Sequence, residues 1–508
     1  MAIDRAAVEK LATGESDERS AAIAALVTEG DPKAAAILEA VAEGDVQVVE
    51  QKGVKRVLIV KSGAATDAIT GEKVGPVPEG AEDVVANNRL RKEIEGALSA
   101  LKLISPDREV RMKAAKELAA GADESLLPLV QKALSKETEA DIKSTLELIA
   151  ASLELKSGAK ETRIAAIRRL GASNSPNSRT LLSEAATDAD EDIKREAQKA
   201  LREVQGKLAW GERAGLLFAG VSLGSILLLA ALGLAITYGL MGVINMAHGE
   251  LIMIGAYTTY AVQVLFRKTS FFDWYLLAAV PMSFIVSAAV GMLLERLVIR
   301  WLYGRALETL LATWGISLML IQSVRTMFGA QNVQVENPNF MSGGIQAFAG
   351  VVFPWSRIWV IGFAALVLFA MYLLLTKTRL GLFIRGVTQN REMASCVGVP
   401  TGSVDMWAFG LGSGIAGLAG CALSQLGNVG PDLGQGYIVD SFMVVVFGGV
   451  GQLAGTVYAA LTLGFANKFL ESMSGAVIAK IVVLVFIIIF IQRRPQGLFA
   501  VKGRAVEA

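Results

Sequence analysis

Nine apolar stretches after residue 210 set the strongest limit on what this chain can fold into. A helix needs about 20 mostly apolar residues to cross the ~30 Å hydrocarbon core of a bilayer. Windows of this kind cover residues 216–238, 246–266, 275–298, 306–328, 358–376, 405–426, 437–450, 453–470 and 476–492. Short polar breaks separate them. The pattern predicts a polytopic α-helical membrane domain with 8–9 spans.

The residues before these windows have a different composition. Residues 1–210 hold 31 Lys and Arg and 36 Asp and Glu, whereas the longer remainder holds only 18 and 12. Dense charge on a helical pattern is typical of a soluble domain. The sequence therefore predicts a soluble domain at 1–210 and a membrane domain at 211–508. The fold class is all-α, apart from one small insertion.

The soluble part repeats a pair of amphipathic helices. Residues 17–45, 107–155 and 160–204 each place Ala, Leu and Ile at helical spacing on both sides of a polar turn. This pattern resembles HEAT-type repeats, which stack because one helix pair cannot bury its apolar face alone. Residues 46–86 alternate and are β-branched, which predicts a small β-hairpin insertion. Such a domain serves as a packing module or as a docking surface, and the sequence leaves both open.

Basic residues in three short breaks predict the orientation. Of the 18 basic residues after position 210, 11 fall at 296–305, 377–391 and 493–504. Lys and Arg favour the cytoplasmic side, and placing all three breaks there agrees with nine crossings, a cytoplasmic C-terminus and a periplasmic N-terminal domain. Residues 1–14 lack an apolar signal core, so we expect that a native signal peptide is missing from this sequence. The alternative is the inverted topology.

The stretch INMAHGE, residues 244–250, holds the only histidine of the chain between the first two spans. Asn245 is a candidate helix cap. His248 either responds to protonation or fixes a turn by hydrogen bonding at a helix end. Glu250 is a functional candidate because ionisable groups inside membrane segments are rare and usually have a role. We expect a cytoplasmic hinge in which these polar side chains cap exposed helix ends.

Residues 376–400, TKTRLGLFIRGVTQNREMASCVGVP, form the pattern of one basic amphipathic helix between two spans. Its apolar face holds Leu380, Ile384 and Val387. Such a helix lies on anionic lipid or seats in a groove of a cytoplasmic partner. The residues alone favour neither.

The glycine-rich stretches do not fit nucleotide-binding loops. Residues 448–464 lack the G-x-G-x-x-G spacing, and Lys73 is followed by Val where a P-loop has Ser or Thr. We therefore expect no ATPase site, no catalytic residue, no metal ligand and no cofactor in this chain.

Four motifs resemble the permease subunits of branched-chain amino-acid-type ATP-binding-cassette importers. They are GSILLLAALGLAITYGLMGVINMAHGELIMIGAY (224–257), TKTRLGLFIRGVTQNREMASCVGV (376–399), FGGVGQLAGTVYAALTLGFAN (447–467) and IQRRPQGLF (491–499). An exported helical domain ahead of the permease is similar to the urea-permease branch of this family, which narrows the expected substrate to urea or short amides. The alternatives are a branched-chain amino-acid permease with an unusual extension, a non-transporting membrane scaffold, and a secondary transporter.

The resemblance also implies partners and a location. The partners are a homologous second permease that completes a heterodimer, two cytoplasmic ABC ATPases that use the ATP, a periplasmic substrate-binding protein, and membrane lipid, with no nucleic acid. The location is the bacterial inner membrane. Residues 379–397 would dock in an ATPase groove and couple ATP binding to transport. The coupling residues are Arg379, Leu380, Ile384, Arg385, Arg391 and Glu392.

A path for urea needs amide or hydroxyl groups instead of charges, because urea is small and neutral and forms several hydrogen bonds. The candidate lining residues are Thr313, Ser317, Gln322 and Asn428. Each of them could equally form a hydrogen bond between helices.

Overall fold

The chain forms two compact units, Met1–Ala209 and Trp210–Ala508, and each is described by itself. The computed structural model describes residues 5–29, 32–51, 54–61, 64–76, 78, 81–84, 86–119, 126–173, 175–348 and 350–499. The boundary between the units falls within the long helix α10 (Glu191–Met241).

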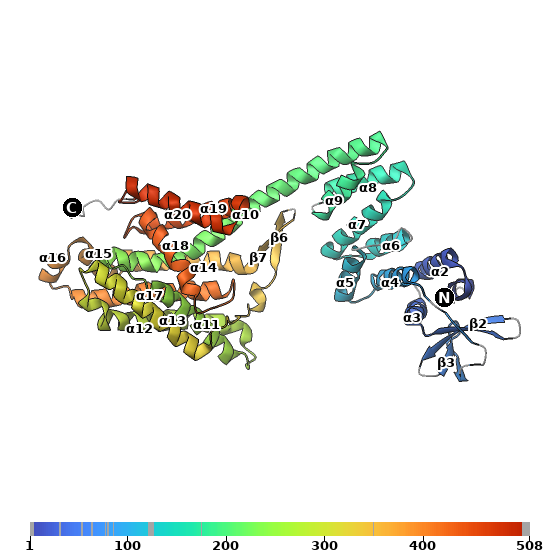
Figure 1. Cartoon of the computed structure of the whole chain (residues 1–508), viewed down its shortest axis with the longest axis horizontal. Helices are drawn as coiled ribbons and strands as arrows, with labels where there is room; N and C mark the ends of the chain where they lie inside the picture. Colours follow the sequence, from blue (N-terminus) through green and yellow to red (C-terminus); the bar gives the residue numbers. More distant parts are fainter. Residues whose placement is uncertain are drawn as a thin grey trace. The chain divides into compact units, whose positions relative to one another are not determined.

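The N-terminal unit is mainly helical (Figure 1). Its helices are α1 (Arg5–Thr13), α2 (Ser16–Glu29), α3 (Pro32–Glu43), α4 (Asn88–Lys102), α5 (Arg108–Ala119), α6 (Leu127–Lys136), α7 (Ala140–Leu155), α8 (Lys160–Ala172), α9 (Asn177–Ala185) and the start of α10. Leu, Ile, Val and Ala at helical spacing fill two cores, one under α1 to α7 and one between α7 and α10. The structure does not test whether the array belongs to the HEAT type, which stays a prediction.

The insertion expected at 46–86 is larger than one hairpin. It is a five-stranded antiparallel sheet in the order β4-β3-β2-β1-β5. The strands are β1 (Val46–Gln51), β2 (Val54–Lys61), β3 (Ala64–Asp67), β4 (Lys73–Pro76) and β5 (Glu82–Asp83). The hairpin is its centre, where Val46 pairs with Ile59 and Val48 with Val57. The later strands were missed because β3, β4 and β5 are too short to show alternation.

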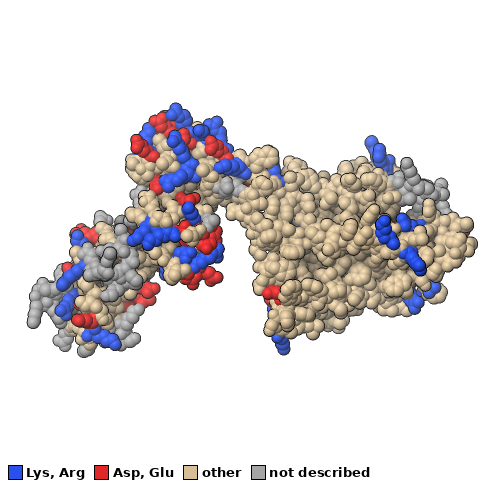
Figure 2. Space-filling view, turned by 180° about the vertical axis from the view of Figure 1, so that it is seen from behind, with Lys and Arg blue, Asp and Glu red and all other residues tan. Residues whose placement is uncertain are grey.

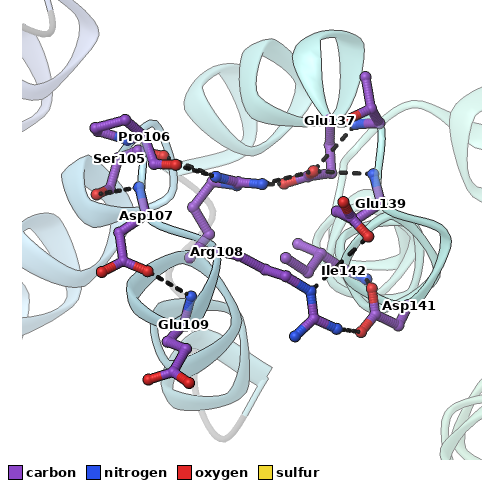
Figure 3. A network of polar contacts seen from close by, with 11 residues as sticks. Ser105, Pro106, Asp107, Arg108, Glu109, Glu137, Glu139, Asp141 and Ile142 are labelled. Atoms are coloured by element: carbon purple, nitrogen blue, oxygen red, sulfur yellow. Dashed lines mark hydrogen bonds and ion pairs between the residues drawn. The ribbon is translucent and has the colours of Figure 1, made fainter.

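A set of ion pairs fastens α5 to the turn before α7 (Figure 3). Arg111 donates to both carboxylate oxygens of Glu137, at 2.8 and 3.2 Å. Arg108 lies 2.5 Å from Asp141 and 3.8 Å from Glu139. Glu137 is the buried member, with 3% of its side chain exposed. Bidentate pairing of this kind fixes the orientation of the arginine as well as its position.

The same set recurs once along the chain. Lys160 at the start of α8 pairs with Asp190 at 2.9 Å and with Asp192 at 2.7 Å, and Arg163 pairs with Asp188. The basic residues of the two sets are 52 positions apart and the acidic residues 51 positions apart. The helices α5, α6 and α7 are therefore followed by the equivalent series α8, α9 and α10, held by equivalent contacts.

The C-terminal unit is a bundle of long helices with one short hairpin, β6 (Gly344–Phe348) and β7 (Val351–Pro354). After α10 its helices are α11 (His248–Phe266), α12 (Tyr275–Leu297), α13 (Ala306–Phe328), α14 (Trp355–Lys377), α15 (Arg379–Gln389), α16 (Arg391–Cys396), α17 (Thr401–Ser424), α18 (Leu433–Gly448), α19 (Leu453–Ser474) and α20 (Ala476–Arg493). Short 3-10 turns lie at Phe272–Trp274, Ile299–Trp301 and Asn339–Met341. All nine apolar windows are helical.

Six helices in the described part of the chain are long and apolar enough to cross a membrane, fewer than the 8–9 expected. They are Glu191–Gly239, Phe272–Trp301, Leu307–Phe328, Trp355–Lys377, Thr401–Ser424 and Ala476–Arg493. The other three apolar windows correspond to α18, α11 and α19. Helix α18 has only 16 residues, the first turn of α11 contains His248 and Glu250, and α19 carries Lys468 and Glu471. The number of crossings stays a prediction.

Charge is distributed differently over the two units (Figure 2). Blue and red side chains are scattered over the N-terminal unit. On the C-terminal unit, the charged side chains visible on this face lie near its ends and leave an uncharged band between them. An uncharged band of this kind is what hydrocarbon requires of the protein surface that it touches.

Helix α17 is the centre of the bundle. In its most apolar window 83% of the residues are buried inside the chain, against 17% in that of α20. It packs against α11 and α12, and its glycines and alanines let those helices approach closely. The residues of α11 are thereby enclosed between α17 and the rest of the bundle.

We predict that Glu137→Gln loosens the packing of α5 against α7 only above acidic pH. The hydrogen bonds from Arg111 hold the pKa of Glu137 below its usual range. A lowered carboxyl pKa stabilises the folded state above the unfolded value of about 4.3, and this stabilisation is lost as the pH falls through the folded pKa. Hydrogen exchange of α5 and α7 in the full chain should therefore be faster in the variant at pH 7, and the difference should shrink in acid.

The matched control is Glu109→Gln on α5, whose side chain points away from these ion pairs in Figure 3. It should exchange like the parent at every pH. Equal effects of the two substitutions would show that the Arg111–Glu137 pair does not stabilise this contact.

Candidate functional site

The polar stretch before α11 folds back into the helical bundle. The Nε2–H of His248 donates to the backbone oxygen of Ala230 at 3.0 Å. Ala230 precedes the end of α10 at Met241 by 11 residues, or about 16 Å of helix. In the next turn, the hydroxyl of Ser287, midway along α12, donates to Leu251 O at 3.1 Å. The first turn of α11 therefore lies at the depth of Ala230, near the middle of the apolar window 216–238 of α10, and of the middle of α12.

This placement differs from the expected hinge, in which the polar residues cap exposed helix ends. Asn245, His248 and Glu250 are each at most 1% exposed. A close backbone approach allows it: a Cβ added to Gly249 would lie 2.6 Å from the backbone oxygen of Gly434 at the start of α18. Glycine spacing was visible in the sequence, but which glycines face each other was not.

Asn245 and His248 have structural contacts. The side-chain oxygen of Asn245 accepts a hydrogen bond from Ala247 N at 3.0 Å. The helix cap is Ala247 and the helix starts at His248, so Asn245 forms the turn before the cap instead of capping the helix itself. The hydrogen bond of His248 to Ala230 ties α11 to α10. This geometry is that of the histidine that fixes a turn by hydrogen bonding, the second of the two roles considered for this residue type.

Two of the four candidate lining residues meet this stretch. Ser317 donates to Glu250 Oε1 at 2.8 Å, and the hydroxyl of Thr313 accepts from Met246 N at 3.2 Å. Thr313 and Ser317 are four residues apart and so share one face of α13. The structure thus brings the candidate path residues of α13 together with Glu250, which the sequence had assigned to a separate hinge.

The other two candidates lie elsewhere. Gln322 is exposed and falls on a different face of α13 from Ser317. Asn428 is exposed in the segment between α17 and α18. Neither contacts Glu250 or Thr313 through any hydrogen bond found among the described residues. A polar residue type near a span was too weak a signal to separate these two from Thr313 and Ser317.

The coupling segment, residues 376–400, forms two helices instead of the single one expected. The side chain of Thr378 caps α15 by accepting from Gly381 N at 3.2 Å, and that of Asn390 caps α16 by accepting from Met393 N at 2.9 Å. Asn390 has extended backbone angles, so the helix breaks there. An asparagine at such a position is a common N-cap, and this signal in the sequence was overlooked.

The two faces of α15 and α16 differ. Ile384 and Val387 are buried against the bundle, and Leu380 packs beside them half-buried. The outer face combines charged and apolar residues. Its charged members are Arg379, Arg385, Arg391 and Glu392, and its most exposed apolar members are Leu382, Met393 and Val397, at 59, 60 and 75% exposure. Exposed apolar side chains in such a cluster are typical of a surface that another molecule covers.

A cluster of polar side chains fastens the coupling segment to the bundle. Arg391 at the start of α16 forms an ion pair with Asp405 of α17. Its guanidinium also lies over the ring of Tyr303, 5.0 Å from the centroid, and Tyr303 donates to Glu295 of α12 at 3.0 Å. Asp405 lies near the start of an apolar window, where a carboxylate is usually solvated, but its side chain is fully buried. The contact with Arg391 was missed because only the fold brings the two together.

These contacts also place two of the three basic breaks at the same end of the bundle, since Tyr303 lies in the first break and Arg391 in the second. Away from that end, Arg267 pairs with Glu336, and Arg325 with Asp432 at 2.8 Å. Among the described residues, no group of three or more His, Cys, Asp or Glu side chains could hold a metal ion.

Comparison with known proteins identifies relatives of the C-terminal unit. A family model described as the permease component of branched-chain amino acid transport systems matches residues 216–491. The chain is 29% identical over 287 residues to the high-affinity branched-chain amino acid transport system permease protein BraD of Pseudomonas aeruginosa, covering 55% of this chain and 93% of BraD.

Two further relatives match over the same part of the chain. LivH of Salmonella typhimurium, the corresponding high-affinity permease protein, is 29% identical over 293 residues, covering 56% of this chain and 94% of LivH. The probable branched-chain amino acid transport permease protein LivH of Methanocaldococcus jannaschii is 25% identical over 300 residues, covering 56% and 91%. No solved structure matches the chain.

We predict that His248→Ala impairs folding and insertion before it alters any binding property. The substitution removes a buried hydrogen bond and leaves a cavity between α10 and α11, which together cost about 2–4 kcal/mol. The yield of the chain extracted from membranes as a monodisperse species should fall. His248→Gln keeps an N–H donor and should recover part of the yield. Parental yields from His248→Ala would mean that this contact does not hold α11 in place.

Proposed function

Because the chain belongs to the family of permease components of branched-chain amino acid transport systems, we propose that it forms the transmembrane path of an ATP-binding-cassette importer. The observation that best supports this proposal is the extent of the family match. The match covers residues 216–491 and therefore essentially the whole helical bundle, including INMAHGE and the coupling segment. The permeases BraD and LivH align over more than nine-tenths of their own length.

The importer would need further subunits. We propose a homologous second permease that completes the path in a heterodimer, two cytoplasmic ATPases and a substrate-binding protein. The chain itself supplies no ATPase site in this proposal. Its part is to open and close a path when the ATPases bind and hydrolyse ATP.

The coupling segment is the proposed contact with one ATPase. Its outer face offers apolar side chains, among them Met393 and Val397, and arginines beside them, and a helix of this kind seats in a groove through its apolar anchors. Arg391 and Asp405 would pass a displacement of α16 to α17, because an ion pair with one fully buried partner resists separation. The sequence also allows the coupling segment to lie on a lipid surface. In that case nothing would displace α16 when ATP binds.

The orientation belongs to the same proposal. If an ATPase covers α15 and α16, their end of the bundle faces the cytoplasm, as the basic residues at 377–391 suggest. The N-terminal unit would then be periplasmic, in a multi-pass protein of the inner membrane. There it would serve as a packing module or a docking surface for another component, and its helical repeats suit either role.

Branched-chain amino acids are the first substrate candidates, because BraD and LivH are named as their permeases. This order reverses the expectation from the sequence, which favoured urea. Urea and short amides remain the second candidates, and one feature favours them: the family match leaves residues 1–215 uncovered. A helical extension ahead of the permease resembles the urea-permease branch of the family, whereas the relatives found by comparison give urea no support.

Substrate-stimulated ATP hydrolysis tests this proposal. The full complex, with the second permease, the ATPases and the substrate-binding protein, is reconstituted in vesicles and given leucine or urea. We predict that leucine raises the hydrolysis rate severalfold and that urea leaves it unchanged. Stimulation by urea alone would replace the first substrate candidate with the second. A complex that hydrolyses no ATP and takes up neither solute would contradict the permease function and favour a membrane scaffold.

A further inference from the structure

The contact between α11 and α13, here called the seam, concentrates buried polar atoms that lack a hydrogen-bond partner. In the described part of the C-terminal unit, seven such side-chain atoms occur. Four of them belong to α11, to the turn before it or to α13: Asn245 Nδ2, Glu250 Oε2, Tyr257 Oη and Arg325 Nε. A buried polar group left without a partner costs about 1–3 kcal/mol, so a cluster of them calls for a physical explanation.

The four groups follow the seam in order. Near the start of α13, Thr313 bonds to Met246 N, next to Asn245. One turn further, Ser317 bonds to Glu250. Towards the end of α13, the ring of Phe328 lies 4.9 Å from that of Tyr257, and Arg325 pairs with Asp432 at 2.8 Å. The seam thus runs from the buried turn before α11 to a partly exposed ion pair at the end of α13.

The four atoms that lack a partner are buried, and they differ in chemistry. Asn245 is 0%, Glu250 1% and Tyr257 2% exposed. Asn245 and Arg325 have a free N–H donor, Glu250 has a free oxygen acceptor, and the Tyr257 hydroxyl acts as either. Glu250 already accepts one hydrogen bond from Ser317, which fixes its carboxylate and leaves the second oxygen for another donor.

We propose that the seam is the solute-binding part of the translocation path, and that Glu250 accepts an N–H group of the solute while Asn245 donates to an oxygen of it. The ligand class is a small molecule with N–H donors and a carbonyl or carboxylate acceptor. A free amino acid and an amide such as urea both have this chemistry. This inference rests on the proposed function, and it adds the site and the roles of its residues.

Placement of the site in mid-bundle fits transport better than it fits stability alone. A carboxylate among apolar helices is costly, and it is retained mainly where a solute or an ion passes. Secondary transporters commonly bind their solutes near mid-membrane, where a helix is interrupted inside the bundle. Here α11 begins beside Ala230, near the middle of the apolar window 216–238 of α10, which brings Glu250 and Asn245 to that depth.

The test is solute uptake by the full complex in vesicles, with leucine and urea as separate probes. Glu250→Gln keeps the size of the side chain but replaces a charged acceptor with a weaker one. We expect uptake of the transported solute at low concentration to fall about tenfold, because the variant loses one charge-assisted hydrogen bond to the solute. A fall in leucine uptake would identify the N–H group bound by Glu250 as that of an amino acid, and a fall in urea uptake as that of an amide.

Glu308→Gln is the matched control, because Glu308 also lies on α13 but is exposed and paired with Arg305. It should transport like the parent. If Glu250→Gln does not assemble, Ser317→Ala and Tyr257→Phe each remove only a hydroxyl, and both should raise the solute concentration needed for half-maximal uptake. Parental uptake by assembled Glu250→Gln, or by both hydroxyl variants, would overturn the inference while leaving the permease function intact. Absence of uptake by the parent complex would overturn both.

Discussion

The close approach of α11 to the helices around it is the constraint on which the rest of the membrane unit depends. Gly249 meets the backbone of Gly434, and Gly255 meets that of Gly417. A side chain at any of these positions would push α11 away from α17 or α18. Small residues allow such contacts in a bundle where no hydrophobic force drives the helices together. Because the contacts exist, α11 begins inside the bundle, and its polar first turn is enclosed.

This packing also connects the two regions to which we assign function. Helix α17 carries Asp405, which holds Arg391 of the coupling segment, and further along it carries Gly417, which packs on α11. One helix therefore touches both the surface proposed to meet an ATPase and the helix that carries Glu250. In our proposal, a displacement of α16 would reach the seam through the single helix α17, a contiguous link of the kind that can carry coupling between distant sites.

Hydropathy and helical spacing predicted the elements well, because both are local properties. Every apolar window became a helix, and the inward face of α15 holds Ile384 and Val387 as its spacing indicated. What the sequence could not provide were contacts between distant residues. Glu250 and Ser317 are 67 positions apart, and their hydrogen bond is set by the packing of α11 against α13. The same holds for Asp405, whose burial depends on the placement of α16. The break at Asn390 was a local signal and could have been found.

The most direct test of this account is whether the first turn of α11 lies beside the middle of α13. In a chain with Cys396→Ser and Cys421→Ser, which removes both native thiols, Glu250→Cys and Ser317→Cys are introduced together and treated with a short bifunctional thiol reagent. We expect efficient cross-linking within one chain, and little when Gln322→Cys on another face of α13 replaces Ser317→Cys. Cross-linking of the 250–322 pair but not of the 250–317 pair in a folded chain would contradict it.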